Sequence, residues 1–537
     1  MTVTTPPYRS ELSAGRDGFG QLLHAEWTKF RTVRGWTIGL IIGVLAMTGL
    51  GVLTAGGAQS SCQSSGGGPV RSGAACGPSF TLGPAGEPVN DSFYFVHQPL
   101  AGDGSITVRL TSMTGRLPSA NAGLGSVGPA STGDTRPGLY PWAKAGIIIK
   151  ENLNQGSAYA AMMAAADHGV RMQWNYTGDT AGLSGAVSSG SPRWLRLTRS
   201  GDVITGYDSV DGTHWTEVSA VTLSGLPRVV QVGLFAASPE YTIKGQAFSG
   251  TSTIGLGPTQ VTAVFDHVSG VGGAWAGEDV GRPLDYPGFG DYHQAGGQVT
   301  VTGTGDIAPI PEGHGGDADS ALTVTEYLLG TFAGLIAVGV VAALFITAEY
   351  RRNLIRVTFA ASPRRGRVLA AKSVVVAAVS FVVGVVGAAV AVLLGAAITH
   401  ARGYYEFPVS GATELKVIIG TGLFAAVAAV LALAIGAIVR RGAAAVAIVI
   451  VAIAVPIFLA ISAALPLGAA DWVLRVTPAA GIALQQAYTQ YNQVTGVIYS
   501  PLSGYYPLSW WAGLLVMCAW AAAALAGAVY LVRRRDA

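Results

Sequence analysis

The chain has 537 residues, of which half are apolar and only 12% are charged, with 74 glycines and a net charge of +3. It is too apolar for an ordinary soluble enzyme and too long for one domain, so we expect one part in the membrane and one in water. The small net charge, with basic residues at the flanks of apolar runs, argues against a nucleic-acid partner.

The N-terminal region, residues 1–35, predicts a cytosolic amphipathic helix on the inner membrane surface. Apolar side chains recur there at helical spacing. A polar lead without a convincing cleavage pattern precedes them, so we do not expect a cleaved signal peptide. The apolar positions are Phe19, Leu22, Leu23, Trp27, Phe30 and Val33.

Six uncharged runs are each long enough to cross a bilayer, which takes about 20 apolar residues. The short segments on the predicted inner side hold 17 lysines and arginines, whereas the short outer loops hold three. This bias predicts a multi-pass protein of a bacterial plasma membrane with both termini in the cytosol. The first span is 36–58, and the rest belong to a permease domain, 327–537, at 327–348, 373–399, 417–439, 442–465 and 508–532.

Residues 59–326 lie between the first two spans and are predicted to be extracytoplasmic. Residues 59–90 are rich in Gly, Ser and Pro and predict a flexible linker. Residues 91–270 contain about ten short β-rich runs separated by turn residues, which indicates an antiparallel sandwich. Residues 271–326 predict one or two strands and a connector. The expected fold is a six-helix transmembrane bundle with an all-β jelly roll inserted between spans 1 and 2.

The three cysteines are Cys62, Cys76 and Cys518. Outside the cytosol, Cys62 and Cys76 could form a disulfide that closes a short loop, and the alternative is two free thiols in the linker. Cys518 lies within an apolar run and is expected to be a small buried hydrophobe.

The stretch 349–372 carries seven basic residues and one acid, Glu349. Apolar residues interleave with the first basic group, which predicts a short amphipathic helix at the membrane surface, broken at Pro363. The plainer alternative is a loop that only fixes topology.

Two motifs resemble permease subunits of type-2 ABC exporters: E-Y-R-R-x-x-I-R-x-T-x-x-x-x-P-R-R-x-R-x-x-x-A-K at 349–372 and A-E-W-T-K-F-R-T-V-R-G-W at 25–36. The resemblance implies that 349–372 docks on a separate ABC ATPase, which binds ATP and Mg²⁺. It also implies a second permease, identical or related, and short re-entrant helices before the last span. By position, the coupling residues would be Glu349, Arg351, Arg352, Arg356, Pro363, Arg364, Arg365 and Arg367, with Glu26, Trp27, Lys29 and Arg31 in an N-terminal connecting helix.

A second resemblance covers about 91–270. The strings W-A-K-A-G-I-I-I-K-E, W-L-R-L-T-R-S-G-D and G-Y-x-S-x-D-G-x-x-W are similar to concanavalin A-like jelly rolls of the laminin-G kind. Trp142, Trp194 and Trp215 could stack on sugar rings, although core packing is the alternative. No Glu-x-Asp-x-Glu triplet supports glycoside hydrolysis.

Aspartates 279, 285, 291, 317 and 319 could hold calcium, but their spacing matches no calcium loop and favours a solvated acidic surface, so we expect no bound metal or cofactor.

The six runs lack charged and histidine side chains except at their ends, which disfavours an ion-driven carrier. The chain also lacks G-x-x-x-x-G-K-[ST], so it has no phosphate loop of its own. The expectation is a non-enzymatic permease subunit driven by a partner ATPase. Two alternatives stay open: a membrane-anchored carbohydrate receptor and a membrane-anchored polysaccharide-active enzyme.

Overall fold

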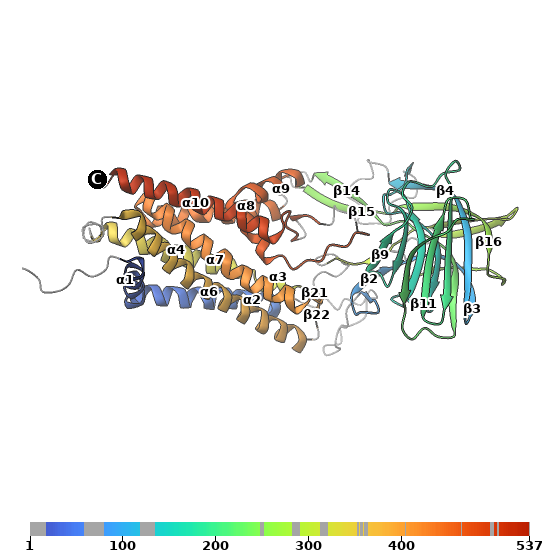
Figure 1. Ribbon diagram of the computed structural model, residues 1–537, viewed down its shortest axis with the longest axis horizontal. Coiled ribbons are helices and arrows are strands. Elements are labelled where there is room, and N and C mark those ends of the chain that lie inside the picture. Colours follow the sequence, from blue (N-terminus) through green and yellow to red (C-terminus); the bar gives the residue numbers. More distant parts are fainter. Residues whose placement is uncertain are drawn as a thin grey trace, which may run out of the picture.

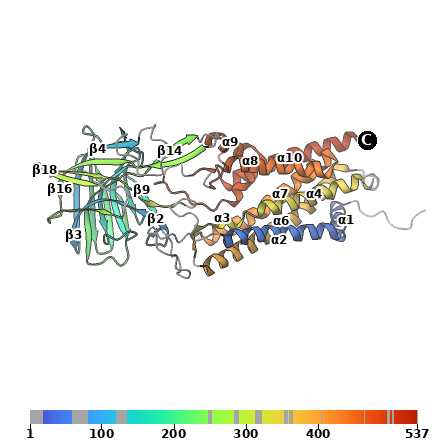
Figure 2. The ribbon, with the colours of Figure 1, turned by 180° about the vertical axis from the view of Figure 1, so that it is seen from behind.

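A computed structural model describes residues 18–57, 80–118, 135–246, 252–281, 290–311, 321–351, 354, 358, 364–402, 404–462, 464–494, 499–501 and 504–535. The chain forms an elongated helical bundle with a β-sandwich at one of its ends (Figure 1). The view from behind shows the same arrangement, with the first helix lying across the end of the bundle that is far from the sandwich (Figure 2).

Six of the helices are long and apolar enough to cross a membrane, as predicted. One of the six precedes the strands of the sandwich and five follow them. The helices are α1 (Phe19–Thr32), α2 (Arg34–Gly57), α3 (Val324–Tyr327), α4 (Thr331–Arg351), α6 (Arg365–Ala401), α7 (Gly411–Val439), α8 (Gly442–Ile461), α9 (Leu467–Val476), the 3-10 helix η2 (Pro478–Gln485) and α10 (Trp510–Arg535).

Two helix boundaries differ from the sequence prediction. Helix α6 begins at Arg365, not near residue 373, so that Lys372 lies inside the helix. The second apolar run is divided into α3 and α4, and the Glu326 carboxylate accepts from the Thr323 backbone N–H at 2.9 Å at the start of α3. At the break, a side chain on Gly330 would meet the carbonyl oxygen of Met47 in α2 at 1.9 Å, so α2 and α4 approach there by their backbones.

The segment before the last helix turns back into the bundle. Helix α9 and η2 follow α8, and every residue of η2 is buried. Gly420 of α7 and Gly513 of α10 admit η2 closely, because a side chain there would lie 2.5 Å from the carbonyl oxygen of Leu484 and 2.3 Å from that of Ala480, respectively. Short re-entrant helices at this place were implied by the family resemblance.

The sandwich consists of two large antiparallel sheets, as the strand pattern predicted. The first has the order β12 (Thr216–Thr222), β11 (Val203–Ser209), β10 (Arg193–Ser200), β4 (Gly104–Pro118), β16 (Gln260–Ser269), β19 (Gln298–Gly303), β18 (Asp291–Ala295), with β5 (Thr135–Pro137) beside β4. The second has the order β17 (Ala276–Val280), β3 (Phe93–Ala101), β13 (Val229–Ala237), β6 (Lys144–Lys150), β7 (Tyr159–Ala165), β8 (Gly169–Trp174), β9 (Gly178–Ala181).

The main core lies between these sheets, where alternate residues of each strand point inward. Ile106 and Leu195 of the first sheet and Val96 and Ile147 of the second belong to it, and all four are fully buried. The alternation explains why these short runs fold as strands.

The outer face of the second sheet is also buried, because the chain segments that enter and leave the sandwich cover it. They form the small sheet β1 (Thr81–Leu82), β2 (Pro88–Asp91) and β20 (Ile307–Pro309). Val89 and Ile307 from this sheet pack with Phe93, Phe95 and Ile148 beneath it. Thus part of the predicted linker, 59–90, is structured, and β17–β20 extend the sandwich beyond the one or two strands expected after residue 270.

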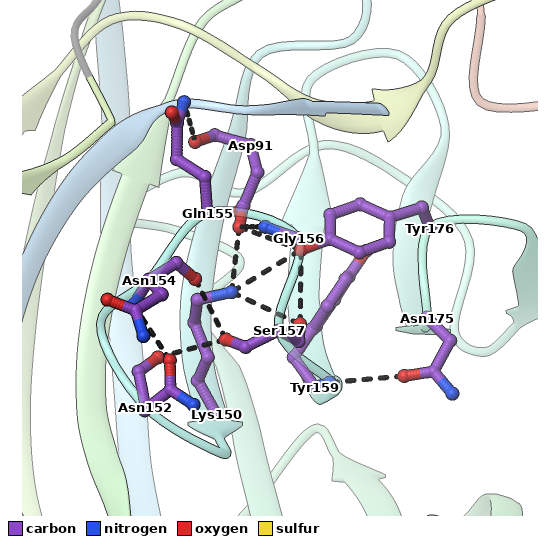
Figure 3. A network of polar contacts seen from close by, with 10 residues as sticks. All are labelled: Asp91, Lys150, Asn152, Asn154, Gln155, Gly156, Ser157, Tyr159, Asn175 and Tyr176. Atoms are coloured by element: carbon purple, nitrogen blue, oxygen red, sulfur yellow. Dashed lines mark hydrogen bonds and ion pairs between the residues drawn. The ribbon is translucent and has the colours of Figure 1, made fainter. Parts of the chain in front are cut away.

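A buried ion pair fixes this cover in place (Figure 3). The Lys150 Nζ atom on β6 lies 2.7 Å from the Asp91 Oδ2 atom on β2, and both side chains are fully buried. The Tyr176 hydroxyl donates to the same oxygen at 2.7 Å, and the Gly156 backbone N–H donates to it at 2.8 Å. Burial lowers the pKa of the Lys150 ammonium, although the charge of Asp91 opposes that shift.

Two small two-stranded pairs complete the fold. The ribbon β14 (Tyr241–Gln246) and β15 (Ser252–Gly257) extends from the sandwich towards α9 (Figure 1). At the end of the bundle that faces the sandwich, β21 (Ala321–Leu322) pairs in parallel with β22 (Tyr405–Glu406) (Figure 1). The Tyr405 hydroxyl donates to the Gly86 carbonyl oxygen at 2.7 Å, which joins the loop between α6 and α7 to the sandwich cover.

Candidate functional site: a buried charge cluster at the end of the bundle

Helix α1 is held across the end of the bundle by its apolar face. Phe30 is buried and contacts the ring of Phe345 edge to face at a centroid distance of 5.5 Å. Trp36, at the start of α2, packs on the same Phe345 ring at 5.1 Å. The Trp27 ring stacks beside Phe30 at a centroid distance of 6.4 Å, and Phe19 and Trp27 are both exposed at this end of the bundle.

Four charged side chains meet where α1 touches the bundle, and we call them the charge cluster: Glu26, Lys29, Glu349 and Lys372. The Lys372 Nζ atom lies 2.6 Å from Glu26 Oε2 and 2.7 Å from Glu349 Oε1. The Lys29 Nζ atom lies 2.9 Å from Glu26 Oε1 and 3.2 Å from Glu349 Oε1. Each lysine therefore bridges both carboxylates, and the cluster joins α1, α4 and α6.

The cluster is sheltered from water and carries no net formal charge. The side chains of Lys372, Glu26 and Glu349 are 0%, 2% and 10% exposed, whereas that of Lys29 is 42% exposed. The Lys372 ammonium also lies 4.4 Å from the centre of the Phe345 ring, within cation–π range. Burial tends to lower the pKa of Lys29, but its bonds to Glu26 and Glu349 outweigh this and raise that pKa.

The charge cluster can transmit movement between helices, but its geometry does not indicate a reaction that breaks a covalent bond. A buried ion pair contributes little net stability compared with apolar packing, yet removing one partner is costly because the other charge is left unpaired. The cluster therefore specifies one position of α1 against α4 and α6. Movement of α1 or of either helix end would be passed to the other two.

The predicted coupling arginines lie around this cluster in different roles. Arg351 at the end of α4, and Arg364 and Arg367 at the start of α6, are exposed, as is Arg31 on α1. Arg365 instead binds the end of α10, since its Nη1 donates to the carbonyl oxygen of Val532 at 3.1 Å. The exposed arginines thus give this end of the bundle a basic surface.

Several predicted residues lie outside the described part of the chain: Arg352, Arg356, Pro363, Cys62 and Cys76. Between Arg351 and Arg364, Leu354 and Thr358 are described and helical, and the Thr358 hydroxyl donates to the Leu354 carbonyl oxygen at 3.1 Å. The predicted disulfide and the break at Pro363 stay predictions.

The residue that sequence reasoning missed is Lys372. It was counted among the basic residues of a loop, whereas it is a fully buried member of α6. The signal that could have found it is the apolar run Val368-Leu369-Ala370-Ala371 immediately before it, which continues a helix and places the lysine among buried positions.

The three tryptophans considered for sugar stacking have ring faces that pack against protein groups. The His168 ring stacks on Trp142 at 3.9 Å, and Trp142 is buried. The Arg196 guanidinium lies 3.8 Å from the centre of the Trp215 ring. Trp194 packs against Gly212, where a side chain would come within 2.7 Å of the ring. Sugar binding by these rings stays a prediction.

Among the described residues, no three His, Cys, Asp or Glu side chains lie together as metal ligands would. Burial raises the pKa of the Tyr94 hydroxyl, and the nearby charges of Asp291 and Asp279 add to that shift. The other three aspartates considered for calcium lie outside the described residues.

No protein-family model and no curated protein matches the sequence. A structure of a functionally unknown protein from Saccharomyces cerevisiae covers 34% of this chain and 76% of its own length, at 15% identity and a TM-score of 0.20. Two structures of scytalido-glutamic peptidase with transition state analogs cover 40% of this chain and 98% of theirs, at 10% and 11% identity and a TM-score of 0.22. Similarity at this level carries no argument about activity.

Proposed function

We propose that the chain is the membrane permease subunit of an ATP-driven type-2 ABC exporter. A separate ATPase would dock on the basic end of the bundle, and the jelly-roll sandwich would lie outside the cytosol. A second permease, identical or related, would complete the transport pathway, because six spans make half of one in this class. ATP and Mg²⁺ would bind to the ATPase.

The observation that carries the proposal is the charge cluster, which joins α1 to α4 and α6. If an ATPase binds the segment between α4 and α6, its movement must be transmitted to the membrane-spanning helices. Since Lys372 binds carboxylates from both α1 and α4, α1 and the two span ends form one unit. Force applied to the exposed arginines beside it would then move whole helices instead of a loop.

The distribution of charge in the helices supports an external energy source. In the six long helices, charged side chains lie near helix ends, and the described interior is apolar or weakly polar. Proton and ion relays need carboxylates, histidines or paired charges within the membrane. In this bundle the paired charges lie at the α1 end, where they join helices, so transport would depend on a partner for energy.

The orientation follows from the positions of the basic residues. Exposed arginines occur at the ends of α4 and α10 and at the starts of α6 and α8, all at the α1 end of the bundle (Figure 1). The positive-inside rule would place that end in the cytosol and the sandwich at the opposite face.

Charge reversal of the exposed arginines tests the ATPase contact. The variant carries Arg351→Glu, Arg364→Glu and Arg367→Glu, and Arg365 is kept because it binds α10. We expect its affinity for an ABC ATPase encoded beside this chain to fall at least about tenfold in co-purification, because three attractive contacts become repulsive.

A matched control reverses three exposed arginines elsewhere, Arg136, Arg228 and Arg475, with the same change in net charge. The control variant should still bind the ATPase and stimulate its hydrolysis of ATP. Equal binding by both triple variants would show that the basic end is not the docking surface.

A further inference from the structure

A short segment after η2 connects the interior of the bundle to the sandwich. It comprises residues 486–494, which leave the buried helix η2 and run outward, and the red-brown coil reaches the sandwich near β9 (Figure 1). The Gln493 side-chain amide donates a hydrogen bond to the backbone carbonyl oxygen of Tyr176, which is 317 residues away in sequence. Gln493 is only 2% exposed, so the sandwich and its neighbours enclose this contact.

The receiving end of this contact is rigid. Tyr176 and Asn175 form the turn between β8 and β9, and both have positive φ angles, 61° and 41°. The Tyr176 hydroxyl is bound to Asp91 in the buried network, and the Asn175 side chain accepts from the Tyr159 backbone N–H at 3.2 Å (Figure 3). The carbonyl that Gln493 binds is therefore fixed to the body of the sandwich.

The other end of the segment is fastened inside the bundle. The Gln485 side-chain amide donates to the Thr331 hydroxyl at 2.8 Å and to the Thr421 hydroxyl at 3.0 Å, and all three residues are buried. These bonds tie the last residue of η2 to α4 and α7. They are neutral amide–hydroxyl bonds, each worth about 1 kcal/mol net.

The segment is short and is fastened along its length. Gln493 follows Gln485 by eight positions, and eight residues span at most about 29 Å when fully extended. Two further bonds shorten its free length: the Gln486 side chain accepts from the Tyr506 backbone N–H, and the Tyr491 backbone N–H donates to the Tyr499 hydroxyl, both at 2.8 Å. These bonds leave only a short connection through which a displacement of the sandwich would reach η2.

We propose that the sandwich restrains η2 through Gln493, so that the docked sandwich holds the outer end of the bundle closed and a displaced sandwich releases it. The restraint is a conformational device at the end opposite the charge cluster, and it does not depend on an ATPase. A ligand or force that acts on the sandwich would thereby control the packing of η2 between α7 and α10.

Hydrogen–deuterium exchange of the full chain in lipid nanodiscs tests this restraint. With Gln493→Ala, the amides of 479–485 should exchange about fivefold faster, which is the scale expected for losing one hydrogen bond that stabilises the closed form. Gln490→Ala is the matched control, because Gln490 binds the Tyr505 hydroxyl within the same outer loop. It should leave exchange in η2 unchanged. Gln485→Ala is the positive control, since it removes the bonds to Thr331 and Thr421 directly.

The amides of β6 serve as an internal reference for the folding of the sandwich. Faster exchange in η2 with unchanged exchange in β6 supports the restraint. If Gln493→Ala speeds exchange only in 486–494 and leaves η2 as in the parent, the contact is local and the proposal is overturned. If β6 also exchanges faster, Gln493→Asn, which keeps the amide on a shorter side chain, replaces the alanine variant and the same criterion decides.

Discussion

Replacing Lys372 by Met is the sharpest test of the charge cluster. Methionine fills similar space without charge, so the change removes the ammonium and leaves the packing nearly intact. Glu26 Oε2 then loses its partner at 2.6 Å, and Glu349 loses one at 2.7 Å. Lys29 still reaches the Oε1 atoms of both carboxylates, but its side chain is 42% exposed and its bonds are longer.

The size of the effect follows from the burial of the pair. Removing one partner of a buried ion pair costs about 3–5 kcal/mol, because the remaining charge is left unpaired. Lys29 compensates in part, so we expect the lower limit, about 3 kcal/mol. Since 1.4 kcal/mol is tenfold in an equilibrium constant, release of α1 from the bundle becomes about 150-fold more favourable.

Amide exchange of α1 in the full chain measures this release. The peptides covering Phe19–Thr32 should exchange about 150-fold faster in Lys372→Met than in the parent. Lys29→Met is the matched control, and a half-exposed partner should contribute only about 1 kcal/mol, or roughly fivefold. The double variant Lys372→Met with Glu349→Gln should recover part of the loss, because the unpaired charge is removed with its partner.

Two results would refute this reasoning. A change below about twofold for Lys372→Met would mean that apolar packing through Phe30 and Phe345 alone holds α1. A double variant that is worse than Lys372→Met by the full effect of Glu349→Gln would mean that the two residues act independently.

Three further predictions concern the sandwich and η2. Lys150→Met should lower the free energy of unfolding of the sandwich by about 3–5 kcal/mol, measured by denaturant titration, because it leaves a buried carboxylate unpaired. Burial raises the pKa of Glu240, so the folded state binds its proton more tightly and this group lowers stability as pH rises above the usual glutamate value. Glu240→Gln should therefore stabilise the sandwich at pH 7 but not at pH 4 in thermal unfolding. Gly420→Ala should displace η2 and cost about 1–3 kcal/mol, seen as faster amide exchange in 479–485, whereas Gly411→Ala on the same helix meets nothing within 4 Å and should not.

The long helices were predictable because the apolar runs are long and uncharged. Length and hydropathy alone locate α2, α7 and α10 to within a few residues at most boundaries. The predicted start of the span at residue 373 is wrong for α6, because the charge of Lys372 was taken to mark the end of the helix. A lysine ends an apolar run in composition, but a helix continues through it where a partner carboxylate is available.

The strands were predictable from their turn residues and from the alternation of apolar and polar side chains. The cover over the outer face of the second sheet was not predictable. The run Ala160–Ala164 is unusually small and apolar for a strand, and it was still recognisable from its flanking turn residues. Nothing in residues 80–91 indicated that they would pair with β20 and cover a sheet face. That pairing joins segments more than 200 residues apart, and short two- and three-residue contacts leave no periodic pattern.

For the candidate site, the resemblance to exporter permeases singled out three of the four cluster residues: Glu26, Lys29 and Glu349. Their contact with each other and with Lys372 depends on how α1 crosses α4 and α6, which tertiary packing determines. The contact of Gln493 with Tyr176 could not be predicted either, because a backbone carbonyl acceptor in a turn does not require a particular residue type.

The two ends of the bundle differ in how strongly they resist movement. At the α1 end, three helices are joined by the four ion pairs of the charge cluster and by the ring contact of Phe30 with Phe345. At the sandwich end, η2 is held by amide hydrogen bonds that are each worth about 1 kcal/mol net. If force enters at the α1 end, as in the proposed exporter, α1, α4 and α6 would move together, and the weaker contacts around Gln485 and Gln493 would yield first. The bundle would therefore open at its outer end while its inner end stays assembled, which is the order of events that outward transport requires.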